Sequence, residues 1–372
     1  MYRVQNVTYV FSGKRKLSIH SGNVFAKEFY YGALDFDKTK YKVKLIEYSN
    51  TKNLFHIFLN LIDRVISKLF SIPFSSSKLL NLENFKILLK TDHLILVNEG
   101  VAFSILPLLI AIKPFRKIKV SVFVMGLYSK KLNYKIFKLV HNSLIKFLVL
   151  FLDNIFFLGI GEFNKAKKFH KNIEKLTYFP FSVDTDFWIN DNEFNFDNNR
   201  NILFVGNDGN RNTNLLLEIA KMIPEYEFTF VSKIPELQDL KLNNVELFSG
   251  SWGDSNIDDR ALREIYNKAF MVIIPLKESS QPSGQSVALQ AMSMGIPVLI
   301  SETEGFWDKE YLQNEVNLFL ISPNTTEEWV RKINNLSNNK ILLEKVSSEA
   351  QETVKNNFNL SIFQDMLLSY IQ

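Results

Sequence analysis

The sequence predicts an α/β fold built from two Rossmann-like domains, each with a doubly wound parallel sheet. Short apolar runs that suit buried strands alternate with helical patterns along the chain, and this order is typical of parallel βαβ units. With 372 residues, the chain is longer than one hydrophobic core usually organises. The alternation is interrupted at residues 184–200, an Asn- and Asp-rich stretch that suits a linker.

The first half of the chain is predicted to hold five strands and two leading helices. The strands are expected at residues 4–11, 43–47, 94–97, 119–124 and 155–158. One helix is expected at 24–34. Another is expected at 54–70, where apolar residues recur at helical spacing and polar residues fill the other face. A helix at a membrane interface and a helix that packs on the sheet give the same stripe, and we interpret this one as the side that packs on the sheet.

The second half repeats the alternation after residue 200. Strands are expected at 202–205, 228–231, 245–248, 271–275, 298–300 and 318–321, with helices near 214–222, 260–269 and 286–294. Residues 361–371 form an amphipathic terminal helix. The predicted division is an N-terminal domain at 1–183, a linker at 184–200, a C-terminal domain at 201–356 and a terminal helix within 357–372.

The composition excludes several classes of chemistry and of location. There is no cysteine, so a disulfide framework, a thiol nucleophile and a thiolate metal site are excluded. The first residues lack the pattern of a secretory leader, and charges interrupt the longest apolar run, at residues 144–160. We therefore expect a cytoplasmic protein, with a peripheral position on the inner face of the membrane as an extension of that expectation.

Charge is distributed unevenly along the chain. Residues 1–180 hold 29 Lys and Arg against 11 Asp and Glu, whereas the remainder holds 15 against 28. A basic half of this kind suits an anionic partner such as a membrane surface, although a solvated Lys-rich face explains it equally well. No recognisable nucleic-acid-binding module accompanies the charge, so we expect no nucleic-acid partner.

The most informative stretch is Gln281–Ser301, in which a loop of small polar residues opens an apolar helix that leads into a strand. The loop residues are Ser283, Gly284, Gln285 and Ser286. Backbone N–H groups and the helix dipole at such a helix N-terminus favour phosphate. Gln290 lies six residues after Gly284, so the first turns of the helix are expected to carry it close to the loop.

A second loop follows the predicted strand at 202–205. Gly206 permits a tight turn, Asn207 adds a backbone N–H group, and Arg211 offers a two-pronged guanidinium for a diphosphate. After the strand at 271–275, Lys277 adds a second cation and Glu278 a carboxylate. Both loops are expected at the carboxyl ends of parallel strands, where such folds bind ligands.

These stretches resemble the nucleotide-sugar signature of the GT-B glycosyltransferases, in particular the retaining family 4 enzymes (glycosyl transferases group 1). Gln290-Ala291-Met292 matches the family's Glu-Ala-Met, and Gly295-Ile296-Pro297-Val298 matches its Gly-x-Pro-Val. The family's two acidic positions hold Pro282 and Gln290 in this chain. Phe179–Trp188 is similar to the Gly-Val-Asp-x-x-x-Phe stretch that leads into the family's second domain.

The resemblance implies GT-B architecture, in which two Rossmann-like domains face an interdomain cleft and the terminal helix returns to the first domain. It implies transfer of a hexosyl group from a nucleoside diphosphate sugar to a glycan or lipid-linked acceptor, with retention, in cell-surface polysaccharide or glycolipid assembly. No cofactor and no metal are expected. We expect the donor to be bound at Gly206, Asn207, Arg211, Ser283, Gly284, Gln285, Ser286 and Gln290. The catalytic candidates are Arg211, Lys277 and Glu278, of which the two residues after the strand at 271–275 are chosen for their charge and place.

The acceptor side is assigned to loops of the first domain. His20, Ser21 and Gly22 follow the first strand, and Glu99 follows the strand at 94–97. Asp184-Thr185-Asp186 has the spacing of a metal motif known in another transferase fold, but its place in the linker favours a structural role. Because Pro282 and Gln290 replace acidic residues, a non-catalytic GT-B-like binding subunit is the alternative to an enzyme.

Overall fold

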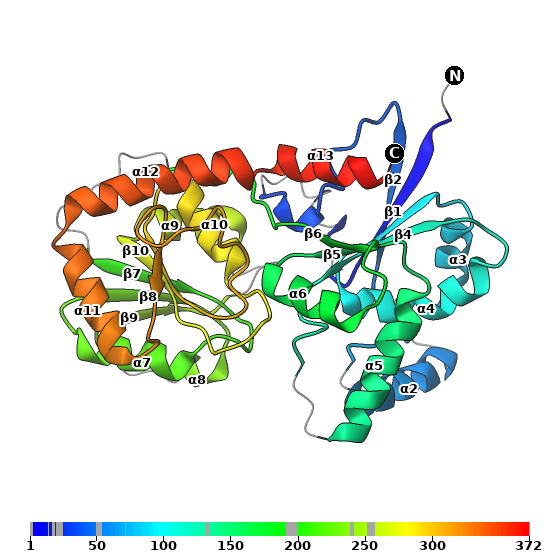
Figure 1. Ribbon diagram of the computed structural model, residues 1–372, viewed down its shortest axis with the longest axis horizontal. Coiled ribbons are helices and arrows are strands. Elements are labelled where there is room, and N and C mark those ends of the chain that lie inside the picture. Colours follow the sequence, from blue (N-terminus) through cyan, green and yellow to red (C-terminus); the bar gives the residue numbers. More distant parts are fainter. Residues whose placement is uncertain are drawn as a thin grey trace. The chain divides into compact units, whose positions relative to one another are not determined.

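The computed structural model describes residues 3–13, 15–16, 19, 25–49, 54–70, 72–130, 134–190, 200–238, 242–250 and 257–371. The chain forms two compact units, each built on its own sheet (Figure 1). The first unit contains Met1–Asn23, Tyr30–Phe179 and Leu367–Gln372. The second contains Val24–Phe29 and Pro180–Met366. Each unit has the predicted α/β character.

The first unit has a six-stranded parallel sheet with the order β2-β1-β3-β4-β5-β6. Its strands are β1 (Gln5–Phe11), β2 (Tyr41–Glu47), β3 (His93–Leu96), β4 (Lys119–Val124), β5 (Asn154–Phe157) and β6 (Leu176–Tyr178). The five strands predicted from the sequence are confirmed. The prediction missed β6, because a three-residue edge strand is too short to show a periodic pattern.

Helical segments of the first unit follow its strands. They are α2 (Leu54–Phe70), η2 (Ser76–Lys78), α3 (Leu82–Leu88), α4 (Glu99–Ile112), α5 (Lys135–Val149) and α6 (Ile160–Phe169). The 3-10 turn η1 (Glu28–Tyr30) has Glu28 and Phe29 in the second unit and Tyr30 in the first. Asn98 caps α4, and its side chain accepts the N–H of Val101 at 2.8 Å. This cap fixes the start of α4 directly after β3.

The helix predicted at 24–34 is wrong for the part of that range that the structure describes. Only the 3-10 turn η1 forms there, and it is followed by turns in which Tyr31 and Gly32 have φ values of 52° and 76°. Two successive left-handed residues end a right-handed helix. Before the turn, the backbone N–H of Ala26 donates to Asp259 Oδ2 at 2.9 Å. The N–H of Ala26 is therefore bonded to a side chain far away in the sequence rather than to a carbonyl within a local helix.

The interpretation of the apolar stripe at 54–70 is also wrong, although the helix itself has the predicted bounds. The large apolar side chains of α2, including Leu54, Phe58 and Leu61, are exposed, whereas its polar residues His56 and Asp63 are buried. The polar residues face inward because the adjacent segment at η2 offers them hydrogen-bonding groups. A periodic pattern locates the two faces of a helix but does not show which one is covered.

The second unit has a six-stranded parallel sheet with the order β12-β11-β10-β7-β8-β9. Its strands are β7 (Asn201–Val205), β8 (Glu227–Val231), β9 (Val245–Phe248), β10 (Met271–Ile274), β11 (Val298–Ser301) and β12 (Phe319–Ile321). All six predicted strands are confirmed. Renumbered within the unit, this is the Rossmann order 3-2-1-4-5-6 read from the other edge.

Helices cover both faces of the second sheet, with α7 and α11 on one face and α10 and α12 on the other (Figure 1). They are α7 (Thr213–Met222), α8 (Pro235–Gln238), α9 (Asp259–Asn267), α10 (Gln285–Ser293), α11 (Thr326–Ser337) and α12 (Lys340–Asn357). The terminal helix α13 (Leu360–Ile371) begins in this unit and ends among the residues of the first.

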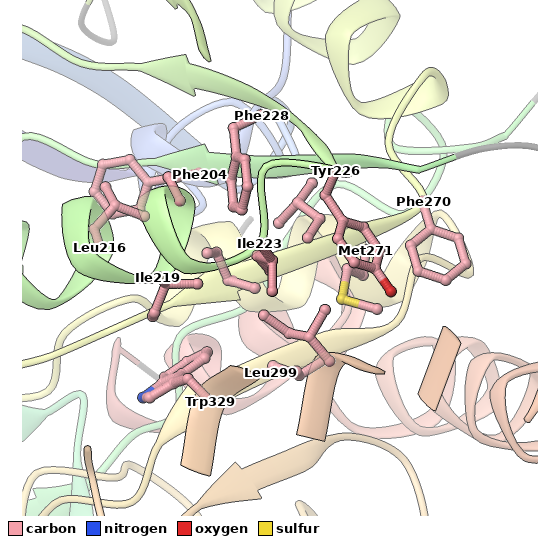
Figure 2. Packing of buried hydrophobic residues seen from close by; sticks show 14 of the residues in the cluster. Phe204, Leu216, Ile219, Ile223, Tyr226, Phe228, Phe270, Met271, Leu299 and Trp329 are labelled. Carbon is pink, nitrogen blue, oxygen red and sulfur yellow. The ribbon is translucent and has the colours of Figure 1, made fainter. Parts of the chain in front are cut away.

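Figure 2 shows the apolar core on the α7 and α11 side of the second sheet. Phe204, Met271 and Leu299 project from three neighbouring strands, and Ile219 and Trp329 come from the helices that cover them. All five are fully buried. Each such side chain contributes about 1.5–3 kcal/mol relative to exposure. The Trp329 indole N–H donates to Asn324 Oδ1 at 2.9 Å, so its polar atom is satisfied.

The topology defines one crevice-forming position in each sheet. In the second unit β7 pairs with β10, and the connections leave these two strands in opposite directions along the sheet. In the first unit the same reversal lies between β1 and β3. Doubly wound sheets bind ligands outside the carboxyl ends of the strands at such reversals. The loops after β7 and β10 are the ones that sequence analysis selected for donor binding.

Candidate functional site

The loops after β7 and β10 are joined by hydrogen bonds into one structure. The N–H of Asn212 donates to the Pro275 carbonyl at 3.0 Å, and the N–H of Lys277 donates to the Asn210 carbonyl at 2.8 Å. The Asn210 side-chain amide donates to Ser283 Oγ at 2.8 Å. The predicted donor-binding residues of the two loops are therefore held beside each other at the reversal point of the sheet.

Two glycines let these loops close around the guanidinium of Arg211. A Cβ atom added at Gly206 would lie 2.1 Å from Arg211 Nε, and one added at Gly284 would lie 3.3 Å from Arg211 Nη1. Gly284 is the N-cap of α10 and has a φ of +81°, which disfavours any other residue. The Arg211 side chain is consequently only 4% exposed.

Arg211 has an incomplete set of partners. Its Nη1 lies 3.4 Å from Asp208 Oδ2, and Asp208 is itself well exposed. Among the described residues, no hydrogen-bond acceptor is found for Arg211 Nε or Nη1. Burial lowers the pKa of this guanidinium, and the Asp208 carboxylate acts in the opposite direction. A buried cation with unused N–H groups beside a helix N-terminus is suited to an anion.

The start of α10 supplies further groups at the same place. Gln285 is buried and Ser286 half-buried in its first turn, and Ser283 stands just before it. The first N–H groups of a helix have no partner within the helix and carry its positive dipole end. Gly284 is the N-cap of α10 and lies beside Arg211 Nη1, so the guanidinium and the helix N-terminus are close together.

Lys277 and Glu278 lie on the exposed part of the loop after β10. Lys277 Nζ donates to the Gly209 carbonyl at 3.2 Å, so its charge lies over the same pair of loops as Arg211. Glu278 Oε1 accepts the N–H of Glu304 at 2.9 Å, which directs this carboxylate to the loop after β11. Of the other two catalytic candidates, Lys277 is therefore held at the loop of Arg211, whereas Glu278 is held at the loop after β11.

The Asn207 side chain connects three loops at the carboxyl edge of the sheet. Its amide N–H₂ donates to the Gly250 carbonyl at 3.0 Å, and its Oδ1 accepts the N–H of Lys233. These two bonds fix the orientation of the Asn207 amide beside Gly206.

Gln290 lies in a buried network rather than at the tip of the loop. Its Nε2 donates to Glu28 Oε1 at 2.9 Å, and its Oε1 accepts the hydroxyl of Tyr266 at 3.2 Å. The indole N–H of Trp188 donates to the same Glu28 oxygen at 2.8 Å. The amide that replaces the family's acidic residue is therefore bonded to a carboxylate, which a second carboxylate at this position would repel.

Sequence reasoning missed Glu28. Its Oε2 is buried without a hydrogen-bond partner among the described residues. Burial raises the pKa of Glu28 to about 7, despite the opposing hydrogen bonds from Gln290 and Trp188. Glu28 stands 262 residues from Gln290 and inside a range expected to be helical, so no local signal pointed to it.

Of the residues assigned to the acceptor in the first unit, His20, Ser21 and Gly22 lie outside the described residues. Glu99 is buried at the start of α4 and accepts the N–H of Met125 at 3.2 Å. Burial raises its pKa. Glu99 therefore holds the loop that follows β4.

A second carboxylate that sequence analysis did not select holds the same loop. Glu162, in the first turn of α6, accepts the N–H groups of Gly126 and Tyr128, each at 2.8 Å. Burial, followed by the charge of Glu99, raises the pKa of Glu162 to about 8. A lone Glu in the first turn of a helix is common, so its burial gave no sequence signal.

Asp184 is buried in the second unit and accepts backbone N–H groups. Lys27 donates to its Oδ2 at 3.2 Å and Phe187 to its Oδ1 at 3.3 Å. Within the described part of the chain, no three His, Asp or Glu side chains gather as metal ligands do. Through these two bonds Asp184 links the segment at Lys27 to the turn at Phe187.

Part of the chain matches a known family. Residues 199–339 match the model of the family described as Glycosyl transferases group 1, so the second unit carries a domain of this family. No curated protein sequence matches the chain.

Solved structures match the chain over its whole length. A glycosyltransferase from Rickettsia africae is 16% identical with a TM-score of 0.65, covering 100% of this chain and 98% of its own. Sucrose-phosphate synthase from Thermosynechococcus elongatus is 14% identical with a TM-score of 0.70, covering 98% of each chain. HepE from Anabaena, in complex with UDP and glucose, is 12% identical with a TM-score of 0.66, again covering 98% of each chain. These similarities establish the GT-B fold.

Proposed function

We propose that this chain, a GT-B protein whose residues 199–339 form a glycosyl transferases group 1 domain, is a hexosyltransferase. The donor is a nucleoside diphosphate sugar, and the acceptor is a hydroxyl of a glycan or lipid-linked substrate in cell-surface polysaccharide or glycolipid assembly. The reaction retains the anomeric configuration and uses no metal ion. The protein acts in the cytoplasm.

Buried Arg211, with Nε and Nη1 lacking acceptors among the described residues, is the observation that supports this proposal most directly. Leaving a buried donor unpaired costs about 1–3 kcal/mol, and more when the group is charged. A diphosphate oxygen would satisfy these groups. Their place at the reversal point of a Rossmann-ordered sheet is where such a ligand binds.

The proposed chemistry stabilises the departing diphosphate. Arg211 and the α10 N-terminus bind its negative charge, and Lys277 adds a cation on the exposed side of the loops. No nucleophile of the protein is assigned, because retention in this proposal proceeds through an oxocarbenium-like transition state. The protein then contributes by positioning the substrates and by electrostatic stabilisation.

Gln290 takes its donor-binding role within the network described above. Glu28 and Tyr266 fix the orientation of its amide, which leaves one N–H and one lone pair for a donor hydroxyl. A neutral hydrogen bond contributes roughly 0.5–1.5 kcal/mol against about 1.5–3 for one to a charged group. We therefore expect weaker donor binding than a carboxylate at this position would give.

A non-catalytic binding subunit is the second candidate, and it is favoured by Pro282 and Gln290 at the acidic positions of the family signature. Thermal shift with UDP, GDP and ADP, followed by hydrolysis of a panel of nucleotide sugars, separates the two. Stabilisation by one nucleotide together with hydrolysis of its sugar conjugate supports the enzyme. Stabilisation without turnover on any donor and acceptor supports the subunit, and no stabilisation at millimolar nucleotide contradicts the donor site itself.

A further inference from the structure

The helix α2 presents its apolar face outward because its polar face is hydrogen-bonded inward. Asp63 Oδ1 accepts the hydroxyl of Ser76 at 2.7 Å, and Asp63 Oδ2 accepts the N–H of Ser77 at 2.8 Å. His56 Nε2 donates to the Leu80 carbonyl at 3.2 Å. These bonds come from residues two helical turns apart, so they fix the rotation of the helix about its axis.

The exposed side chains of α2 form a continuous apolar stripe. Leu54 is 86% exposed and Phe58 61% exposed, and the other members are Ile57, Leu61, Ile62, Val65 and Leu69. They recur at spacings of three and four residues, which places them on one side of the helix. Single exposed apolar residues are ordinary, but a stripe of this length marks an interaction surface.

The helix α5 extends this stripe. It contacts α2 within the first unit, and Figure 1 shows the two helices beside each other. His141 Nδ1 lies 3.1 Å from the carbonyl of Phe70 at the end of α2. The exposed apolar residues of α5 and its flanks are Tyr134, Ile136, Leu139, Phe147 and Leu150. We use the name α2–α5 surface for these exposed apolar residues of both helices together with the exposed basic residues Arg64, Lys68, Lys135, Lys138 and Lys146.

The charge of this surface is entirely positive. Arg64 and Lys68 on α2, with Lys135, Lys138 and Lys146 on α5, are exposed. The one acidic residue of the two helices, Asp63, is buried and bonded to Ser76 and Ser77. Two such surfaces brought together would repel each other. A partner with negative charge and an apolar layer beneath it matches both features.

We propose that the α2–α5 surface docks on an anionic lipid bilayer. The apolar side chains enter the boundary between head groups and acyl chains, about 5–10 Å deep, while the basic side chains meet lipid phosphates. Lys and Arg side chains near an anionic surface are attracted to its phosphates, and this attraction weakens as salt is added. No helix in the described ranges is both long and apolar enough to cross a membrane, so the two helices lie along the bilayer surface.

Vesicle co-sedimentation tests this docking directly. The intact chain should bind vesicles of phosphatidylcholine mixed with phosphatidylglycerol, should bind phosphatidylcholine alone much less, and should be released by salt. The double variant Phe58→Glu/Leu61→Glu should weaken partitioning at least about tenfold, because burying either side chain contributes about 1.5–3 kcal/mol. Lys135→Gln/Lys138→Gln should reduce only the part that depends on anionic lipid.

The control is Ile341→Glu, at an apolar position on α12 that is also highly exposed. It should bind vesicles as the natural chain does. All variants should keep the natural thermal midpoint, since the substituted side chains are exposed. A nucleotide-induced thermal shift, measured without lipid, reports on the donor site separately, so failure of the proposed function and failure of membrane docking are distinguishable.

Insertion is measured with Phe58→Trp. Its fluorescence should shift to the blue with anionic vesicles and be quenched by brominated acyl chains. The proposal is overturned by absence of vesicle binding, by binding that Phe58→Glu/Leu61→Glu leaves unchanged, or by no quenching. It is equally overturned if the same double variant abolishes a dimer seen by light scattering while vesicles are not bound, because the occupant would then be a second copy of the chain.

Discussion

Replacing Gly206 with Ala should destabilise the second unit through a clash with Arg211. The new Cβ would lie 2.1 Å from Arg211 Nε and 2.9 Å from its Cδ, whereas ordinary contacts begin near 3.4 Å. Arg211 must move by more than 1 Å, and it is only 4% exposed, so its surroundings oppose the movement. Overpacking of this kind costs about 1–3 kcal/mol. The backbone at Gly206 does not have positive φ, so strain of that kind is not a competing explanation.

The assay is urea unfolding of four proteins: the natural chain, Gly206→Ala, Arg211→Ala and the double variant. With Arg211 truncated, the added methyl group has space. Gly206→Ala should then be neutral, or should stabilise by about 0.4–1 kcal/mol through lower entropy of the unfolded chain. Gly209→Ala is the matched control in the same loop, because an added Cβ there meets nothing within 4 Å. An equal cost of Gly206→Ala in both backgrounds would refute the assigned contact, since two independent sites add.

Three further predictions concern charge and backbone at the sites described. Arg211→Ala should lower kcat/KM for the donor, and the decrease should correspond to a loss of roughly 2.7–4 kcal/mol of transition-state stabilisation. Steady-state kinetics measures this ratio, and near-normal turnover would remove Arg211 from the proposed mechanism. Glu28 has its pKa raised from 4.5 to about 7, so its stabilising effect is complete below pH 4.5 and is lost as pH rises toward 7. Glu28→Gln should therefore show a smaller loss of unfolding free energy between pH 5 and pH 8, by about 3 kcal/mol, and parallel curves for the two proteins would contradict this pKa. Gly284→Ala should cost more than about 1 kcal/mol in urea unfolding, because its φ is +81° and a Cβ would lie 2.8 Å from Ile274 Cγ2; a neutral result would show that the α10 N-cap relaxes readily.

Sequence reasoning located the strands and the two loops of the candidate site because their signals are local. Residues 271–274 and 298–300 are unbroken apolar runs that end at turn-forming residues, and such runs are typical of buried parallel strands. Gly206 stands directly after β7, Gly284 opens the helix that follows β10, and the Rossmann order brings these two strands together. Local composition and a general rule of topology were sufficient here.

The partners of Glu28, Gln290 and Asp63 were beyond such reasoning because each depends on segments far apart in the sequence or on which helix face is covered. Gln290 looked like a loop contact, since only its helix spacing was visible. Its bond to Glu28 depends on residues 24–29 packing within the second unit. Asp63 belongs to the polar face that the spacing of the 54–70 helix predicts, but that spacing does not show that Ser76 and Ser77 occupy its oxygens.

The membership of Val24–Phe29 in the second unit has a consequence for dissecting the protein. A fragment that starts at the predicted boundary near residue 184 would lack Glu28 and would leave the Trp188 indole and the Gln290 amide without their shared acceptor. Asp184 and Asp259 would also lose the N–H groups of Lys27 and Ala26. The ribosome synthesises residues 24–29 long before the strands of the second sheet. This segment must therefore wait for later residues before it can pack in its own unit. We therefore expect the second unit to fold alone only when residues 24–29 are present together with the fragment from residue 184. The two pieces can be supplied as separate chains or joined by circular permutation.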